Sequence, residues 1–268
     1  MTLRERYGPW ALITGGSEGV GAAFARQLGA AGINLVLVAR AAATLDALAD
    51  EIRASAGVEV RTLARDLSSE DTFGAIVSST DGLEIGLLVH NVGAVFGSGP
   101  FLDGDLDDVR RTLRVNAIGH ATLSLQFGKP MAARGKGGIV LVGSLAGNAG
   151  GASMVLYGAN KAFAQNFAEG LWAELKPIGV DVLYVVLGAT DTPKRAALNI
   201  VDDPSTIVAD PADVARDALS NLDNGPVLVP AHLEDGFRFF TSAPRRQAAE
   251  AMRDLLAGFQ PGIGRDDG

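Results

Sequence analysis

Four polar side chains have the types and order needed to transfer a proton to or from a carbonyl oxygen: Asn116, Ser144, Tyr157 and Lys161. Tyr157 and Lys161 are one helical turn apart, so a helix presents both on one face. A phenol titrates at about pH 10, and a neighbouring ammonium lowers its pKa by favouring the phenolate. Tyr157 could therefore act as general acid or base between a ketone and an alcohol, while the Ser144 hydroxyl orients the carbonyl oxygen.

Each of these residues also has a structural interpretation. Tyr157 and Lys161 could form an ordinary surface pair, with the lysine stem lying along the protein. Ser144 could be a turn residue, and Asn116 a packing residue in a bent helix. Their joint order favours the catalytic interpretation, because Ser144 ends an apolar run, Tyr157 begins a helical one and Asn116 lies on the preceding helix.

A glycine-rich turn near the N-terminus offers a phosphate site. The apolar run ending at Thr14 is followed by Gly15, Gly19 and Gly21, and a helical pattern then begins. A helix N-terminus carries free N–H groups and partial positive charge, and glycines let a pyrophosphate approach the backbone closely. The spacing is neither G-x-G-x-x-G nor the P-loop pattern. A tight strand–helix turn without a ligand is the alternative.

With Thr14, these glycines read T-G-x-x-x-G-x-G, and the chain resembles the non-extended branch of the short-chain dehydrogenase/reductase family. The string YGANK, which begins at Tyr157, is similar to the family's Y-x-A-S-K. Residues His90–Gly93 read HNVG and are similar to its N-A-G element, with histidine where a second asparagine is common. Residues Leu187–Thr192 are similar to P-G-x-x-x-T, with leucine in place of proline. The resemblance extends over Trp10–Pro230.

The resemblance implies a role for each matching residue. Lys161 would also donate to the nicotinamide ribose, and Asn116 would hold a water that links Lys161 to solvent. Asp66 would bind the adenine amino group, with a turn or N-cap role as its alternative. Thr192 would bond the nicotinamide carboxamide. The residues expected at the dinucleotide are Thr14, Gly15, Ser17, Gly19, Val20, Gly21, Arg40, Asp66, Leu67, Asn91, Gly93, Tyr157, Lys161, Gly188, Thr190 and Thr192.

The end of the second predicted strand favours NADP(H) over NAD(H). A carboxylate there would bind the ribose of NAD, whereas an arginine accommodates the 2′-phosphate of NADP. The strand ends in Ala39 and Arg40, and a guanidinium can pair with a phosphate in fork geometry. A solvated charge at a helix start is the alternative for Arg40, and Glu18 would repel the phosphate if it pointed inward. NADP(H) is the predicted cofactor, and no metal is expected.

Alternating strands and helices must position these residues. Runs of Val, Ile and Leu without polar alternation are typical of strands buried on both faces of a parallel sheet. The pattern predicts an α/β fold, a single-domain, doubly wound Rossmann sheet of about seven parallel strands with helices on both faces. Strands are expected at Trp10–Thr14, Ile33–Ala39, Val58–Leu63, Ile85–Asn91, Gly138–Gly143, Val180–Leu187 and Pro226–Pro230. Helices are expected at Val20–Ala31, Thr44–Ala56, Asp105–Phe127, Tyr157–Lys176 and Arg245–Phe259.

Composition sets further limits. The 268 residues contain no cysteine, which excludes disulfides, zinc–thiolate sites and a cysteine nucleophile. A net charge of −8 lacks the basic footprint of proteins that bind nucleic acid or anionic membranes. No apolar leader and no run long enough to span a bilayer is visible, so a cytoplasmic protein is expected. The resemblance also implies a homodimer or homotetramer.

The sequence predicts an oxidoreductase that transfers a hydride between NADP(H) and a ketone or secondary alcohol. Residues 193–210 are expected to cover the substrate as a lid, and 231–268 to form a C-terminal tail. Apolar residues near Ser144 and in the tail suggest an apolar substrate, and a likeness to hydroxysteroid and 3-oxoacyl reductases suggests a steroid-like or acyl-chain carbonyl. A non-catalytic NADP(H)-binding sensor on the same fold is the alternative. Ser144 lies outside any G-x-S-x-G pattern, because Val142 occupies the first position, and this disfavours a hydrolase.

Overall fold

One sheet determines where the polar residues meet. The computed structural model describes residues 1–93, 96, 99–197 and 206–257. Within these ranges, parallel strands form a seven-stranded sheet in the order β3-β2-β1-β4-β5-β6-β7. Their bounds are β1 (Trp10–Thr14), β2 (Asn34–Ala39), β3 (Val60–Ala64), β4 (Ile85–His90), β5 (Gly137–Val142), β6 (Val180–Val185) and β7 (Val227–Leu228).

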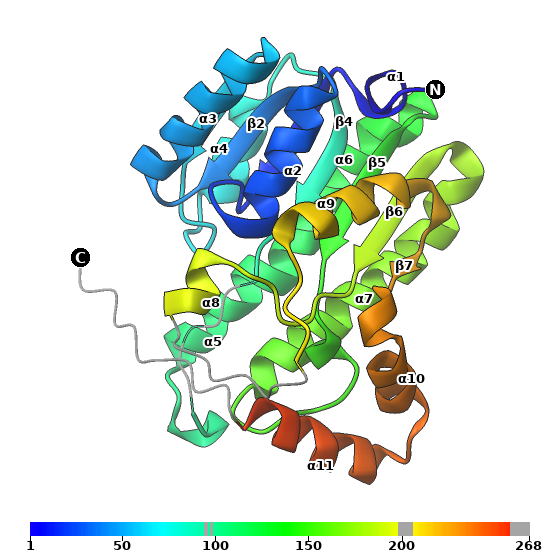
Figure 1. Ribbon diagram of the computed structural model, residues 1–268. Coiled ribbons are helices and arrows are strands. Elements are labelled where there is room, and N and C mark those ends of the chain that lie inside the picture. Colours follow the sequence, from blue (N-terminus) through cyan, green and yellow to red (C-terminus); the bar gives the residue numbers. More distant parts are fainter. Residues whose placement is uncertain (94–95, 97–98, 198–205, 258–268) are drawn as a thin grey trace.

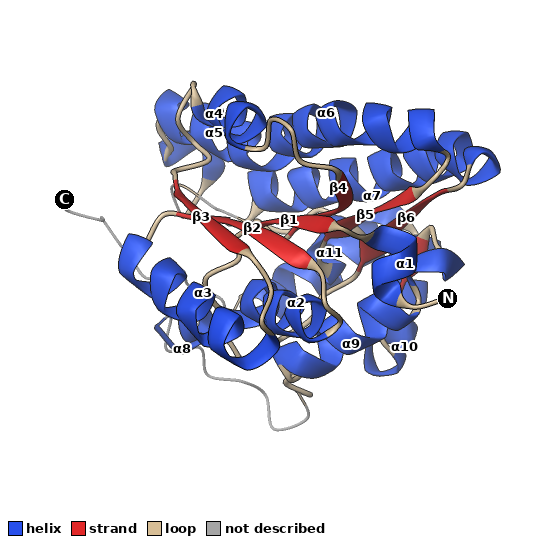
Figure 2. Cartoon of the chain, turned by 90° about the horizontal axis from the view of Figure 1, so that it is seen from above, coloured by secondary structure: helices blue, strands red, loops and turns tan. Residues whose placement is uncertain are grey.

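Helices cover both faces of this sheet (Figure 2). One face carries α2 (Gly19–Ala30), α3 (Ala42–Ala56) and α9 (Pro211–Ser220), and the other carries α4 (Thr72–Ser79), α6 (Gly119–Arg134) and α7 (Val155–Leu175). Each layer buries its own hydrophobic cluster against the strands. The predicted doubly wound α/β fold class is confirmed.

The burial of the strands explains their composition. Every residue of β4, β5 and β6 is buried, as their high content of Val, Ile and Leu indicates. The two edge strands differ from the prediction, since β3 begins at Val60 rather than Val58 and β7 is only Val227–Leu228. An edge strand pairs on one side only, so fewer hydrogen bonds define its ends.

The strand order reverses beside β1. This strand pairs with β2 on one side and with β4 on the other, both in parallel. The chain runs outward through β2 and β3, then crosses back to β4 and continues to β7. In doubly wound folds a crevice forms at such a point, outside the carboxyl ends of the strands, and ligands bind there. The loops that follow β1 and β4 therefore face one another.

The predicted helix Asp105–Phe127 is interrupted. It comprises α5 (Leu106–Leu113), a π-helical turn (Arg114–Ile118) and the longer α6. A π turn widens the helix locally and is frequent at functional sites. The helices that were not predicted include α4 and α9, although Asp210 and Pro211 give α9 a recognisable start: the Asp210 side chain accepts from Ala212 N–H.

The C-terminal helices lie at the opposite end of the molecule from α1 (Leu3–Tyr7), as Figure 1 shows. They are α10 (Glu234–Ser242) and α11 (Arg245–Leu256); the predicted helix end, Phe259, lies outside the described residues. Phe240 and Met252 pack against Ala146 in a small separate core. The tail thus covers the loop that follows β5.

The expected lid is described in two pieces. Helix α8 (Pro193–Ala197) begins it and residues 206–210 end it, whereas residues 198–205 lie outside the described part. Ala209 forms an isolated parallel bridge with Thr190, which joins the returning chain to the segment after β6.

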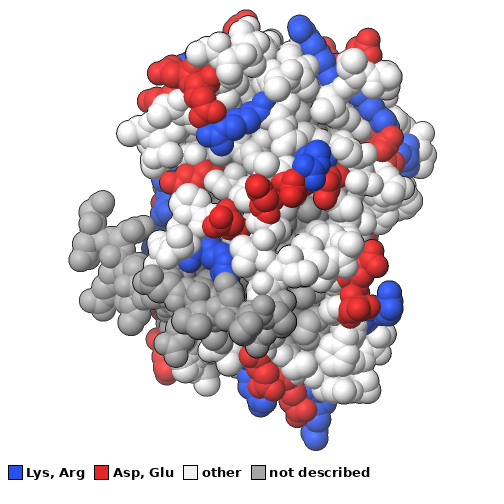
Figure 3. Space-filling view, in the orientation of Figure 1, with Lys and Arg blue, Asp and Glu red and all other residues white. Residues whose placement is uncertain are grey.

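The visible surface mixes both signs of charge. On the face in Figure 3, Lys and Arg are interspersed with Asp and Glu, without a broad basic area. Among the described residues, no helix combines the length and apolarity needed to cross a lipid bilayer.

Candidate active site

Lys161 lies buried at the centre of the predicted catalytic group, with 2% of the residue exposed. Its ammonium donates to the Val142 carbonyl at 2.9 Å and to the Val92 carbonyl at 3.5 Å. Val142 is the last residue of β5 and Val92 lies in the loop after β4, so the lysine joins α7 to the carboxyl-end edge of the sheet. A Cβ on Gly93 would lie 3.1 Å from Lys161 Nζ, so the ammonium packs tightly against this glycine.

Tyr157 lies on the first turn of α7 and faces Ser144. Its ring centroid is 5.6 Å from Lys161 Nζ. Burial raises the pKa of the Tyr157 phenol, and a hydrogen bond with the Ser144 side chain works in the opposite direction. Desolvation of the phenolate is the larger of these two effects, so the net shift in the protein without a cofactor is upward. The lowering of this pKa by Lys161 stays a prediction for the protein with its cofactor bound.

The ammonium of Lys161 is itself close to its titration point. Burial lowers the pKa of Lys161 to about 8, and the charge of Lys194 lowers it further. The side chain is therefore mainly protonated at neutral pH and loses its proton slightly above it. A group with such a pKa can pass a proton in either direction under physiological conditions.

Tyr184 positions Ser144 from the neighbouring strand β6. Its hydroxyl accepts from the Ser144 N–H at 3.1 Å and donates to the Lys161 carbonyl at 3.1 Å. Gly143 makes room for the ring, because a Cβ there would lie 1.8 Å from Tyr184 Cζ. The Ser144 hydroxyl accepts from the Ala146 N–H at 3.2 Å. These contacts hold both the backbone and the hydroxyl of the serine in place.

Asn116 is fully buried in the π-helical turn between α5 and α6. Its Nδ2 donates to the Thr112 carbonyl at 2.8 Å, and its own carbonyl is hydrogen-bonded to His120 Nδ1. The His120 ring meets His90 edge-on, with 4.4 Å between the centroids. His90 Nδ1 pairs with Thr14 Oγ1 at 2.7 Å. A buried chain of contacts therefore runs from Asn116 to the end of β1.

His90 and His120, the two histidines of this series of buried contacts, are neutral at physiological pH. Burial lowers the pKa of His90 to about 3, and the charge of Lys161 adds to the effect. Burial, His90 and Lys161 together hold the pKa of His120 well below its ordinary value. The pair thus connects polar groups beneath the site without placing a second positive charge beside Lys161.

The glycine turn forms a backbone cradle at the crevice. Gly15 has a φ of +66°, and a Cβ on Gly21 would lie 2.0 Å from the Gly15 carbonyl oxygen. Asn91 Nδ2 donates to that carbonyl at 3.2 Å, which ties the loop after β1 to the loop after β4. Glu18, at the N-cap of α2, makes no side-chain hydrogen bond with the first N–H groups. The cradle therefore fits the pyrophosphate of a dinucleotide.

Other predicted cofactor residues lie along the same edge of the sheet. Arg40 is exposed directly after β2. Asp66, which follows β3, accepts from the N–H of Ser68 at 2.8 Å, so it has the turn role weighed as its alternative. Leu67 and Val20 are buried in the hydrophobic core.

The segment after β6 forms the other side of the crevice. A Cβ on Gly188 would lie 2.8 Å from Leu233 Cδ2, so the start of the tail packs against this glycine. Thr190 is buried and its hydroxyl donates to the Gly188 carbonyl at 3.3 Å. A Cβ on Gly19 would lie 2.8 Å from Thr192 Cγ2, so this segment touches the glycine cradle. Ser17 is half-buried within the cradle.

The structure thus brings the catalytic group and the glycine cradle to one crevice, while Arg40 and Asp66 lie farther along the sheet edge. Sequence reasoning missed Tyr184, His120 and Lys194. Tyr184 is one apolar-looking residue in a buried strand, and its only signal was the glycine before Ser144. Its function depends on sheet register, which pairs it with Leu141 of β5.

Comparisons with known proteins agree with this geometry. The family model for short chain dehydrogenase matches residues 9–201. A very-long-chain 3-oxoacyl-CoA reductase from Podospora anserina is 34% identical over 219 residues, which cover 80% of this chain and 63% of that protein's length. A 7beta-hydroxysteroid dehydrogenase from Collinsella aerofaciens is 34% identical over 193 residues, covering 72% of this chain and 73% of the relative.

Solved structures show the same fold. A structure of 7beta-hydroxysteroid dehydrogenase, from work on its stereoselectivity, superposes with a TM-score of 0.87 at 28% identity, covering 94% of this chain and 99% of that one. A short-chain dehydrogenase from Sphingobium yanoikuyae in complex with NADPH gives 0.76 at 32% identity, covering 97% and 99%. The matched segment contains both the glycine cradle and the Tyr157–Lys161 pair, and the chain therefore belongs to the short-chain dehydrogenase family.

Proposed function

We propose that the protein is an NADP(H)-dependent oxidoreductase that interconverts a ketone and a secondary alcohol, with Tyr157 as general acid/base. The observation that carries this proposal is the placement of Tyr157 beside Ser144, with its ring centroid 5.6 Å from Lys161 Nζ, at the same crevice as the glycine cradle. A hydroxyl donor, a proton-transferring phenol and an ammonium are the groups that carbonyl reduction requires.

Each residue has a distinct task in this proposal. When bound, the nicotinamide supplies or accepts the hydride. The Ser144 hydroxyl donates to the carbonyl oxygen and fixes its position, and Tyr157 gives it a proton in reduction or removes one in oxidation. Lys161, with a pKa of about 8, replaces the proton that the phenol loses. Asn116 supports the end of that proton route from the π-helical turn.

The cofactor preference rests on the end of β2. Ala39 and Arg40 supply no carboxylate to a ribose, and the exposed guanidinium of Arg40 suits a 2′-phosphate. The relative from Sphingobium yanoikuyae, solved with NADPH, supports the same preference. Glu18 is at the N-cap of α2, one position before the helix, and the proposal requires its carboxylate to point away from that phosphate.

The substrate is proposed to be an apolar carbonyl compound, steroid-like or with an acyl chain. Met154 is buried, and Leu145 packs against the cluster that contains Phe240 and Met252 of the tail. Relatives named 7beta-hydroxysteroid dehydrogenase and very-long-chain 3-oxoacyl-CoA reductase act on substrates of these kinds. Residues 193–210 are proposed as a substrate lid, and a homodimer or homotetramer as the assembly.

A panel of ketones and alcohols, followed by nicotinamide absorbance with NADPH and NADP⁺, tests the reaction. Tyr157→Phe should abolish turnover of any active substrate while the dissociation constant of NADPH stays within about twofold of wild type. Turnover equal to wild type in this variant would refute the assigned general acid. Tight NADPH binding by the wild type, with no turnover across a broad panel, would favour the non-catalytic sensor instead.

A further inference from the structure

Lys194 crosses the crevice in which the cofactor is proposed to bind. It is carried by α8, the helix that follows β6, and its ammonium donates to the Gly93 carbonyl at 3.3 Å. Gly93 belongs to the loop after β4. The side chain therefore connects the segment after β6 to the loop after β4. This loop lies at the point where the strand order reverses.

The base of this side chain is beside the glycine cradle. Thr192, two residues earlier, is so close to Gly19 that a Cβ on that glycine would lie 2.8 Å from Thr192 Cγ2. Gly19 is the first residue of α2, whose N-terminus has no side-chain cap. The ammonium of Lys194 thus stands over the crevice between two other sources of positive potential, the α2 N-terminus and Lys161.

Lys194 has no acidic partner in the part of the chain that the structure describes. Among the described residues, no carboxylate forms an ion pair with Lys194, and its one polar contact is the uncharged Gly93 carbonyl. Burial lowers the pKa of Lys194, and the nearby charge of Arg40 lowers it further. Lys194 in turn lowers the pKa of Lys161. Lys194 is thus repelled by Lys161 at the crevice and by Arg40 farther along the sheet edge, and this positive potential favours the entry of an anion.

We propose that Lys194 is a phosphate ligand: its ammonium exchanges the Gly93 carbonyl for the pyrophosphate of the bound dinucleotide. This inference rests on the proposed NADP(H) function and adds a contact from the segment that sequence reasoning assigned to the substrate. The pyrophosphate is common to NADPH and NADH, whereas Arg40 addresses the 2′-phosphate of NADPH alone. Comparing the binding of NADPH and NADH should therefore distinguish the effect of Lys194 from that of Arg40.

Binding of each dinucleotide to the cofactor-free protein tests the inference without any turnover. Dissociation constants of NADPH and NADH are measured by calorimetry at low and high salt for the wild type, Lys194→Met and Lys194→Arg. Lys194→Met should weaken both cofactors about ten- to hundredfold and by the same factor, because a hydrogen bond to a charged group is lost. Lys194→Arg should restore most of the affinity, and salt should weaken the wild type more than Lys194→Met.

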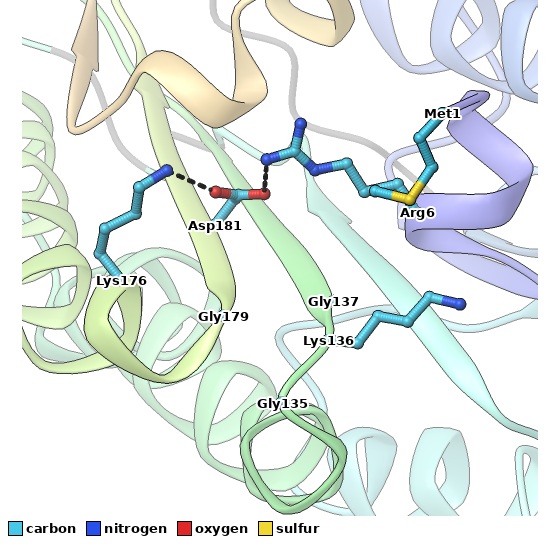
Figure 4. A pocket seen from close by; sticks show the side chains of 8 residues that line it. All are labelled: Met1, Arg6, Gly135, Lys136, Gly137, Lys176, Gly179 and Asp181. Atoms are coloured by element: carbon cyan, nitrogen blue, oxygen red, sulfur yellow. Dashed lines mark hydrogen bonds and ion pairs between the residues drawn. The ribbon is translucent and has the colours of Figure 1, made fainter.

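Lys136→Met is the matched control, since it removes the same charge at the other end of the sheet. Lys136 lines a pocket beside Arg6 and the buried Asp181, at the amino ends of β5 and β6 (Figure 4). The Lys136→Met variant should bind both NADPH and NADH with the affinity of the wild type.

Three results would overturn the proposal. If Lys194→Met and Lys136→Met bind both cofactors with equal affinity, Lys194 is not a ligand of the cofactor, while the proposed function is unaffected. Weakening confined to NADPH would assign Lys194 to the 2′-phosphate and refute the pyrophosphate contact. A wild type that binds neither dinucleotide would refute the proposed function together with this inference, so the two failures are distinguishable.

Discussion

The backbone N–H of Ser144 donates to the side-chain hydroxyl of Tyr184 at 3.1 Å, across two paired strands. The same hydroxyl donates to the Lys161 carbonyl, so one buried phenol connects the serine after β5 to the lysine of α7. Burial raises the pKa of Tyr184 well above its ordinary value, so the group is a neutral hydroxyl at all physiological pH values. It positions two proposed catalytic residues without facing the crevice itself.

Tyr184→Phe should therefore lower both stability and turnover. The Ser144 N–H would lose its partner, which costs about 1–3 kcal/mol in unfolding free energy. Because Ser144 and Lys161 would no longer be held at a fixed separation, kcat should fall by about tenfold with little change in the dissociation constant of NADPH. Urea unfolding and steady-state kinetics measure the two effects.

Tyr7→Phe is the matched control for that substitution. The Tyr7 hydroxyl, also buried, donates to Asp181 Oδ2 at 2.9 Å at the amino end of the sheet. Its loss should lower stability by a similar amount and leave kcat unchanged. A parallel fall of kcat in both variants would show that stability, rather than positioning, accounts for the effect.

Gly21→Ala should weaken cofactor binding by more than about tenfold. The added Cβ would lie 2.0 Å from the Gly15 carbonyl oxygen, a backbone atom that can move only if the cradle deforms. Gly170→Ala in α7, where a Cβ meets open space, is the control; it should leave affinity unchanged and raise stability by up to about 1 kcal/mol. NADPH titration and thermal unfolding of both variants distinguish a local clash from a general intolerance of alanine.

Arg40→Ala should weaken NADPH far more than NADH, by about tenfold or more against less than about twofold. The guanidinium is exposed directly after β2, where the adenosine ribose of the dinucleotide is proposed to lie. Fluorescence titration with both cofactors gives the ratio. An equal response to NADPH and NADH would mean that Arg40 does not contact the 2′-phosphate.

His90→Asn should make stability less sensitive to acid. Burial lowers the pKa of His90 from its ordinary 6.5 to about 3, so between these values the unfolded chain binds a proton that the folded protein does not. Stability contributed by neutral His90 is thus complete above pH 6.5 and falls as the pH drops, by about 1.4 kcal/mol per pH unit for one proton. Urea unfolding from pH 7 to pH 5 should show a shallower decline in the variant.

The exposed His232 provides the comparison for this experiment. His232→Asn should retain the wild-type decline with pH, since its imidazole is surrounded by solvent. An unchanged slope in His90→Asn would show that other groups dominate the acid sensitivity.

The sequence was sufficient to predict those elements whose local residue pattern follows directly from their burial. The buried strands β4, β5 and β6 were predicted within a few residues because continuous apolar runs have few alternatives in an α/β chain. The π-helical turn at Asn116 was not predicted, because one extra residue in a helical turn leaves the spacing of apolar residues nearly unchanged. Helix α4 is short and lacks a side-chain cap, and no start signal marks it.

The sequence by itself determined the fold class, the family and the residues with the chemistry to move a proton, since each depends on residue types at short spacings. Only the tertiary structure decided how Tyr184, His120 and Lys194 bear on that chemistry. Their contacts join strands and helices far apart in the chain, across 40 residues between Ser144 and Tyr184 and 101 between Gly93 and Lys194. The upward pKa shift of Tyr157 and the downward shift of Lys161 are likewise effects of burial, which no local spacing encodes.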